Sequence, residues 1–575
     1  MKLAEALSIV QKTSAELPEF AVTLACGITP LHLQNFLAAH VQTAHADRKV
    51  KIHTGLFGDL AGTVEKVAEQ RQSAIALVIE WPDLDPRLGY RQLGGWGRTA
   101  LATAVEAVET MLQRLEAAIT TVPASTVVAV SLPTIALPPG FHTGSWQASG
   151  MEVTLERAIA EFATRISRGP SVRVVNRAKL DLASPPASRY DLRSDLNTGF
   201  PYTMGHADVL ASALAHLIAP PAPKKGLITD LDDTFWNGLV GEIGPENVSW
   251  DLSSHSQTHG LYQQMLGTLA DHGVLIAIAS KNSPEVVERA LSRSDLAIRK
   301  DKIFPIEVHW EAKSGSVSRI LKTWNIGAES VVFVDDSPME LEEVRALHPG
   351  IECLLFPKND YPASFALLQR LRDLFAKPTL SAEDGFRLES IRAGQELAKT
   401  NGDAGSAEHF LASLAAAITL EYDPPSHDKR VLELVNKTNQ FNLNGVRYTD
   451  AEWEEAKSAP GAFVLAISYA DKFGPLGKIG VIAGVRQDNG VSVNTWVMSC
   501  RAFSRRIEHA CLSELFRHFE TYRILLNFKS TAKNGPTRDF LAQFSENPDD
   551  GWVTIQHSVF ETKCPKLYHQ IYKDR

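Results

Sequence analysis

Acidic residues stand in pairs after two apolar segments of this 575-residue chain. Asp230 and Asp232 follow "GLIT", and Asp335 and Asp336 end the segment "SVVFVDD". Such short apolar runs are typical of buried parallel strands, and ligands bind outside the carboxyl ends of these strands. Carboxylates at that edge can hold Mg²⁺. They can also divide the roles of nucleophile and general acid and base.

Two further residue types suit the same edge. Ser280 ends the apolar run "GVLIAIAS" as a neutral donor for a phosphoryl oxygen, and Lys313 in "HWEAKS" supplies a fixed positive charge. Phosphoryl transfer depends chiefly on charge placed around the transferring group. A single D-x-D at a strand end also occurs as a helix cap, and a lone serine or lysine indicates little. The four elements together predict a Mg²⁺-dependent phosphoryl-transfer site.

The elements that position these residues alternate between strands and helices. We expect strands at 273–280, 303–310, 330–336 and 351–356, and helices at 283–294, 314–324 and 338–347. This alternation predicts an α/β domain over residues 221–360 with a parallel sheet. Only about 35 residues separate Thr234 from the next expected helix, which leaves room for a hairpin flap but not for a cap domain. Such an open site suits a bulky or macromolecular substrate, or closure by a neighbouring domain.

The first third of the chain predicts a doubly wound α/β domain over residues 1–220, because apolar runs alternate with helical patterns. The runs lie at 20–27, 50–55, 73–81, 125–133 and 171–176, and the helical patterns at 97–120, 151–168 and 205–219. The proline-rich stretch "APPAPKK" (219–225) marks the end of this domain.

The last third, residues 361–575, predicts an α+β domain behind a helical connector. Helical patterns at 362–376 and 384–399 precede four mixed strands, and a helix is expected at 505–524.

Composition limits the possible partners and location. The net charge of −9 and the pI near 6.1 argue against a general nucleic-acid or anionic-membrane binder. The five cysteines form no C-x-x-C pair, which favours a reducing compartment over a disulfide framework or a zinc site. The N-terminus lacks the apolar core of a signal peptide, and no apolar stretch is long enough to span a bilayer. These features predict a cytoplasmic protein.

The motif D-x-D-x-T, formed by Asp230, Asp232 and Thr234, resembles the signature of the haloacid-dehalogenase superfamily. The resemblance implies that Asp230 is the nucleophile that forms an aspartyl phosphate, and that Asp232 is the general acid and base. It also implies phosphate contacts from Thr234, Ser280 and Lys313. Mg²⁺ would be bound by Asp230, the main-chain carbonyl of Asp232, and Asp335 or Asp336.

A longer match is more specific. "DLDDTFWNGLVGEIG" (230–244), "ELVNKTNQFNLN" (433–444), "DKFGPLGKIGV" (471–481) and "VNTWVMSCRAFSRRIEHA" (493–510) resemble the FkbH-type branch of that superfamily, over about residues 220–525. Members of this branch are linked to carrier-protein-bound extender units of polyketide and related pathways. Their best-understood activity removes phosphate from 1,3-bisphosphoglycerate and loads the glyceryl group on an acyl carrier protein. The resemblance implies this activity here, with a small phosphorylated substrate and a carrier protein as partners.

Two departures from that family bear on acyl transfer. Leu231 stands where many glyceryl-loading members have cysteine. The C-terminal domain resembles an N-acetyltransferase-type fold, but its turn reads Arg501-Ala-Phe-Ser-Arg505-Arg506 and lacks the glycines that let main-chain amides approach a pyrophosphate. The three arginines are an alternative phosphate contact. Cys500, beside Arg501, is either a reactive thiol or a buried structural cysteine.

The N-terminal domain bears a more distant resemblance to the SGNH-type esterase fold, with "ACGITP" at the nucleophile turn and "GHADVLASALAHL" (205–217) as the late histidine segment. The nucleophilic serine is absent, so we interpret His206 as a helix-start or packing residue. Three functions stay open: an FkbH-type enzyme that loads a carrier protein, a hydrolytic phosphatase of a small metabolite with scaffold flanking domains, and an adaptor that binds a carrier protein.

Overall fold

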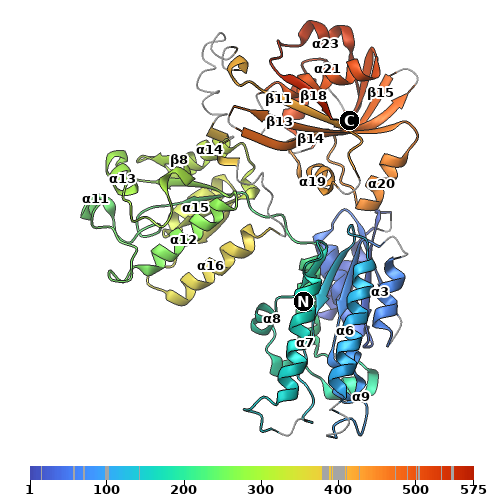
Figure 1. Ribbon diagram of the computed structural model, residues 1–575. Coiled ribbons are helices and arrows are strands. Elements are labelled where there is room, and N and C mark those ends of the chain that lie inside the picture. Colours follow the sequence, from blue (N-terminus) through green and yellow to red (C-terminus); the bar gives the residue numbers. More distant parts are fainter. Residues whose placement is uncertain are drawn as a thin grey trace. The chain divides into compact units, whose positions relative to one another are not determined.

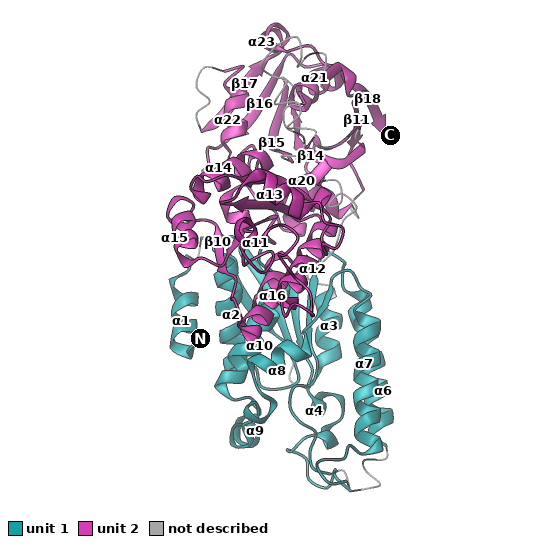
Figure 2. Ribbon diagram, turned by 90° about the vertical axis from the view of Figure 1, so that its left-hand side faces the viewer, with its two compact units in different colours: residues 1–222 teal, residues 223–575 magenta. Residues whose placement is uncertain are grey.

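The computed structural model describes most of the chain (Figure 1). The described residues are 1–14, 16–55, 58–68, 72–97, 101, 103–140, 143–377, 387–389, 391–392, 408, 411–425, 428–472, 474–487, 490–499, 502, 505–531, 534–545 and 550–574. They form two units, residues 1–222 and 223–575 (Figure 2). Within the described residues, no helix is both long and apolar enough to cross a membrane.

Unit 1 contains a five-stranded parallel sheet in the order β2-β1-β3-β4-β5. The strands are β1 (Glu19–Cys26), β2 (Lys49–Thr54), β3 (Ala74–Val78), β4 (Val127–Ser131) and β5 (Val172–Val174). Helices α1 (Leu3–Lys12), α2 (Leu31–Ala44) and α10 (Met204–Ile218) share a core on one face, and α3 (Leu60–Ala68), α6 (Ala104–Thr121) and α7 (Gly150–Ile166) share one on the other. The predicted doubly wound fold is confirmed.

Unit 2 contains two sheets, and the first carries the paired acids. Its five parallel strands have the order β10-β9-β6-β7-β8. They are β6 (Gly226–Thr229), β7 (Leu275–Ser280), β8 (Ile303–Val308), β9 (Val331–Asp335) and β10 (Glu352–Leu355). Helices α12 (Gln257–Asp271), α13 (Pro284–Leu291) and α16 (Tyr361–Phe375) cover one face, and α14 (Lys313–Trp324) and α15 (Pro338–Leu347) cover the other.

The strand order explains where a ligand would bind. The chain leaves β6 toward β7 and β8 and later returns to place β9 and β10 on the other side of β6. A doubly wound sheet opens a crevice at such a switch point, beyond the carboxyl ends of the two diverging strands. Here those strands are β6 and β9, which carry the two acid pairs.

The segment after β6 differs from the expected hairpin flap. Helix α12 begins at Gln257, so the insertion is shorter than the sequence indicated, and it holds a short helix, α11 (Val240–Ile243), with one antiparallel bridge between Asn237 and Ser249. Arg293 fixes its base, since the guanidinium donates to the Val248 carbonyl at 2.7 Å and lies 4.1 Å from the Trp250 ring.

The second sheet of unit 2 is mostly antiparallel, in the order β17-β16-β15-β14-β13-β11-β18, with β12 beside β15. Its strands are β11 (Ala417–Tyr422), β12 (Phe441–Asn442), β13 (Ala462–Asp471), β14 (Gly474–Gln487), β15 (Gly490–Met498), β16 (Arg523–Phe528), β17 (Gly551–Gln556) and β18 (Gln570–Asp574). Helices α19 (Lys429–Lys437) and α20 (Asp450–Ser458) pack on one face, and α21 (Ile507–Phe519) on the other.

This arrangement confirms the α+β class of the last third. The helix expected at 505–524 is α21. The polar helix expected at 384–399 lies mostly outside the described residues. The division of unit 2 at residues 360 and 361 stays a prediction.

Candidate functional site

The two acid pairs meet at the carboxyl edge of the first sheet of unit 2. Asp230 comes directly after β6, and its N–H donates to the Val334 carbonyl at 3.0 Å. This bond extends the β6–β9 ladder by one residue and holds the Asp230 side chain beside Asp335, the last residue of β9. Carboxylate oxygens of Asp230, Asp335 and Asp336 lie within 4.8 Å of one another. Among the described residues, this is the one group of three acids, histidines or cysteines close enough to hold a metal ion.

Lys313 lies among these acids at the first position of α14. Its Nζ is 2.9 Å from Asp230 Oδ1 and 2.6 Å from Asp335 Oδ2, and it also pairs with Glu340 in the first turn of α15. The side chain is 3% exposed. Burial alone would lower the pKa of Lys313, but the three acids outweigh it and raise this pKa, so the lysine carries a fixed positive charge.

Lys313 alone does not neutralise Asp230 and Asp335. Burial raises the pKa of Asp230 to about 7, with Lys313 opposing the rise and Asp335 adding to it. Burial also raises the pKa of Asp335. Buried carboxylates with raised pKa values are charges that lack a sufficient counter-ion. An oxygen-seeking divalent cation supplies that charge, so the residues present fit Mg²⁺.

Asp232 is held apart from the three-acid cluster. Its Oδ1 accepts from the Trp236 indole at 2.9 Å and from the Val240 N–H at 3.1 Å, and its Oδ2 accepts from Asn282 Nδ2 at 2.9 Å. Three donors fix this carboxylate in one orientation, as a positioned general acid requires. The carboxylate is not among those that could share a metal ion, so only the main-chain carbonyl of Asp232 stays a predicted ligand.

The fold of this chain is similar to that of a solved structure. The N-terminal part of the protein BF1531 from Bacteroides fragilis, which contains a phosphatase domain and was crystallised in complex with Mg, aligns over 66% of this chain and 100% of that chain, with a TM-score of 0.52 and 18% identity. The fold is of the haloacid-dehalogenase type. At this identity the likeness concerns the fold alone.

A GCN5-related glucosamine N-acetyltransferase region of a fungal multi-domain β-N-acetylglucosaminidase aligns over 95% of this chain and 66% of that chain, with 10% identity. Its TM-score of 0.17 is too low to support any inference. No protein-family model and no curated protein matches the sequence.

The other two predicted phosphate contacts, Thr234 and Ser280, are both buried. The Thr234 hydroxyl donates to Asp336 Oδ1 at 3.4 Å. Ser280 is buried at the end of β7, and the structure gives its hydroxyl no hydrogen bond to the described residues. Lys358, which the sequence did not single out, lies 2.5 Å from Asp336 Oδ2 and 2.8 Å from Asp233 Oδ2. Asp336 therefore already has a hydroxyl and an ammonium partner.

Helix α12 supports the loop that carries the nucleophile candidate. Tyr262 donates to the Thr229 hydroxyl at 3.0 Å, and that hydroxyl donates to the Asp230 carbonyl at 2.8 Å. His259 Nδ1 lies 2.9 Å from the Thr234 carbonyl, and Gln263 donates to the Phe235 carbonyl at 2.9 Å. Positions 259, 262 and 263 share one helix face, so a single helix fixes several points of the loop.

Leu231, between the two motif acids, faces away from them. Its side chain is fully buried in the core that β6 shares with α12. The position that holds cysteine in many FkbH-type members is therefore a core position in this chain.

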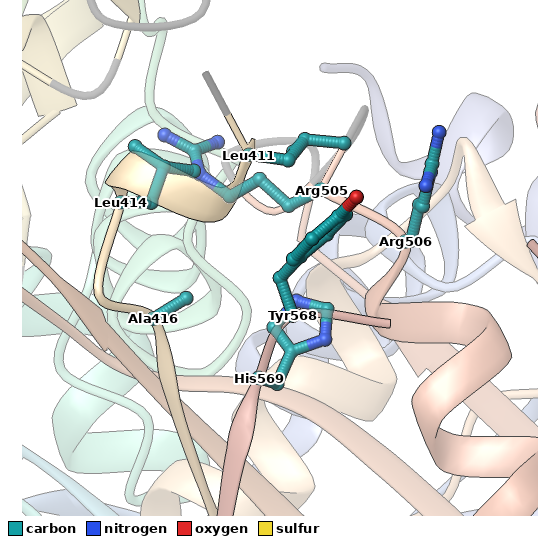
Figure 3. Close-up of a pocket in the computed structure, with 7 residues that line it drawn as sticks. All are labelled: Leu411, Leu414, Ala416, Arg505, Arg506, Tyr568 and His569. Atoms are coloured by element: carbon teal, nitrogen blue, oxygen red, sulfur yellow. The ribbon is translucent and has the colours of Figure 1, made fainter. Parts of the chain in front are cut away.

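The predicted pantetheine-contact residues are only partly described. Cys500 and Arg501 lie outside the described residues. Arg505 and Arg506 line a cavity of about 10 Å³ near Tyr568 and His569 (Figure 3). A single water needs about 10–15 Å³, so this cavity does not admit a pantetheine arm.

Both arginines already have internal partners. Arg505 lies 3.4 Å from Asp471 and faces the Tyr469 ring. Arg506 lies 3.0 Å from Glu408 and donates to the Lys566 carbonyl at 2.8 Å. These pairs satisfy the charges that an external phosphate would need.

His206 in unit 1 is a buried residue of the first turn of α10. It lies 2.9 Å from both the Thr134 and the Ser184 hydroxyls. Burial lowers the pKa of His206 to about 3, so the ring is neutral. These contacts suit the packing role expected from the sequence.

Proposed function

We propose that this chain is a Mg²⁺-dependent phosphatase or phosphotransferase that acts on a small phosphorylated substrate. One observation carries the proposal: Asp230, Asp335 and Asp336 converge within 4.8 Å, with buried Lys313 against the first two, while three donors hold a fourth acid, Asp232, apart from them. This division matches the needs of a nucleophile, a metal site and a general acid. The haloacid-dehalogenase-type fold supports it.

In the proposed first step, an Asp230 carboxylate oxygen attacks phosphorus and the bond from phosphorus to the leaving oxygen breaks. Asp232 gives its proton to that oxygen, and an aspartyl phosphate remains. Ser280 donates to a phosphoryl oxygen, and Lys313 offsets the charge on the nucleophile and the phosphoryl group. Mg²⁺, when held by Asp230, Asp335 or Asp336, supplies further positive charge to the phosphoryl oxygens.

In the second step, Asp232 takes a proton from water as the water oxygen attacks phosphorus. The bond between phosphorus and Asp230 then breaks, which releases phosphate and restores both acids. The three donors around Asp232 keep it in place for both proton transfers.

The finer proposal is that this site removes the 3-phosphate of 1,3-bisphosphoglycerate. The thiol of an acyl carrier protein then attacks the remaining acyl phosphate at its carbonyl carbon, which forms the glyceryl thioester and releases phosphate together with the thiol proton. The FkbH-type sequence resemblance supports it, as does an insertion after β6 that holds only one short helix. The alternative is simple hydrolysis of a small phosphoester. Burial of Leu231 and the internal pairing of Arg505 and Arg506 favour this alternative.

The test is a paired assay on the full chain with 1,3-bisphosphoglycerate and a holo carrier protein. Phosphate release is measured by colour, and carrier loading by intact mass. We expect Mg²⁺-dependent phosphate release that Asp230→Asn abolishes, because an amide cannot form the aspartyl phosphate. Near-normal release by this variant would refute the phosphoryl-transfer proposal. Release without loading would refute only the carrier-protein step and leave hydrolysis.

A further inference from the structure

The C-terminal sheet contains a cavity of about 250 Å³ that the proposed chemistry does not use. Small-molecule sites begin at about 300 Å³, so the cavity approaches the size of a ligand site. Strands β13 to β16, helix α20 and the loop before it supply its walls. All of its lining residues belong to this one sheet domain.

The main chain holds this cavity open. Strands β15 and β16 pair only as far as Val493 and Leu526, and Leu443 bridges them beyond that point through the Trp496 carbonyl (2.9 Å) and the Lys529 N–H (3.1 Å). The adjacent Asn444 side chain donates to carbonyls on both strands, at 2.7 Å and 3.2 Å.

A shift in register shapes the cavity floor. The β14–β15 ladder shifts between Ala483 and Gly484, so Asn494 is an extra residue in β15. Bulges of this kind re-aim side chains and are common beside functional sites. A Cβ at Gly484 would lie 2.1 Å from the Ser492 carbonyl, so this floor admits only glycine there.

Two lining side chains lack partners in the described part of the chain. The carboxamides of Asn494 and Asn527 make no hydrogen bond there, whereas Asn444 uses its own to join two strands. A carboxamide both donates and accepts hydrogen bonds, so each of these two side chains can donate a hydrogen bond to a ligand and accept one from it. Trp453 and Tyr448, whose ring centroids lie 5.4 Å apart, add an aromatic wall.

The charges of the lining exclude most ionic ligands. No aspartate or glutamate is among the described residues that line the cavity, so it offers no counter-charge to an ammonium group. Its one cation, Lys457, already lies 3.2 Å from Glu454. We propose that this cavity binds an uncharged molecule that carries amide or hydroxyl groups on an apolar frame. The inference goes beyond the proposed function, because binding here requires no turnover at Asp230.

The first measurement is calorimetric titration of the full chain with two probes that share one frame. Panthenol is an uncharged amide with hydroxyl groups, and pantothenate adds a carboxylate to that frame. We expect saturable binding of panthenol, at least tenfold tighter than that of pantothenate. Absence of saturable panthenol binding, or equal binding of both probes, would overturn the proposal.

Substitutions place the probe in the cavity. Ala456→Trp, on the side of α20 that lines the cavity, should block binding, while Ala451→Trp on the same helix, which does not line the cavity, should leave it unchanged. Asn494→Ala should weaken binding by about three- to tenfold at unchanged melting temperature, because it breaks no internal bond. Asn444→Ala should lower the melting temperature. Binding that survives Ala456→Trp would refute the site.

Discussion

Replacing Lys313 by methionine removes a buried cation that contacts three acids. At an effective dielectric constant of about 20, each contact of Lys313, 2.6 Å to Asp335 and 2.9 Å to Asp230, gains about 6 kcal/mol. Desolvation of the ammonium, which is 3% exposed, offsets much of this gain. Removal of one partner from a buried ion pair costs about 3–5 kcal/mol, and we expect this loss in the metal-free protein.

The assay is urea unfolding of the full chain, with and without Mg²⁺. Hydrogen exchange at strands β6 and β9 assigns the loss to this domain. Mg²⁺ should restore part of the lost stability, because it supplies positive charge to the same acids. It should not restore turnover, because Lys313 also faces the phosphoryl group. Lys322→Met, at an exposed position in the last turn of α14, is the matched control.

Two results would refute this reasoning. If Lys313→Met unfolds at the same urea concentration as the parent protein, the acids do not depend on this cation. If Mg²⁺ stabilises the parent and the variant equally, the metal does not replace the lost charge, and the cation binds elsewhere.

Three further predictions follow from the same site. Asp336→Ala should weaken Mg²⁺ binding by at least tenfold in calorimetry, since loss of even an outer-shell partner costs about 10–100-fold; an unchanged Kd would remove Asp336 from the metal site. Asn282→Ala removes the hydrogen bond to Asp232. Hydrogen bonds to charged groups are worth about 1.5–3 kcal/mol, so kcat should fall by about 10–100-fold at unchanged Mg²⁺ affinity. A loss of Mg²⁺ affinity would instead show that Asp232 contributes to the metal site. Because the pKa of Asp230 is raised to about 7, a proton competes with the metal below that pH, and Mg²⁺ affinity should rise from about pH 5.5 to about pH 8 with proton release; a flat profile would contradict the raised pKa.

The acid pairs could be predicted from the sequence because each pair directly follows the apolar run that forms its strand. "GLIT" before Asp230 and "SVVFV" before Asp335 are apolar runs that end where the acids begin. A parallel sheet brings such ends together without further information. The predicted α/β class followed from the same alternation of elements.

Helix α12 could not be predicted because its buried face is partly polar. His259 and Gln263 point into the core, where their hydrogen bonds to the phosphoryl-site loop compensate for burial. A search for apolar periodicity does not detect such a face. The error in the length of the flap has the same cause.

Contacts between segments that are far apart in the sequence could not be predicted either. Glu340 and Lys358 reach the site only through the fold, and neither belongs to a recognisable local motif. Arg506 offers a clearer case, because its partner Glu408 stands 98 positions earlier. The sequence indicates a free basic turn, whereas the fold pairs Arg505 with Asp471 and Arg506 with Glu408.

The anchoring of the Asp230 loop by α12 implies that this loop is rigid before any ligand arrives. Its carbonyls are held by Thr229, His259 and Gln263, all side chains of the protein itself. The conformational entropy of the loop is thus lost during folding rather than during turnover. Amides of residues 230–236 should therefore exchange with deuterium almost as slowly as those of β6, and addition of Mg²⁺ should slow them little further.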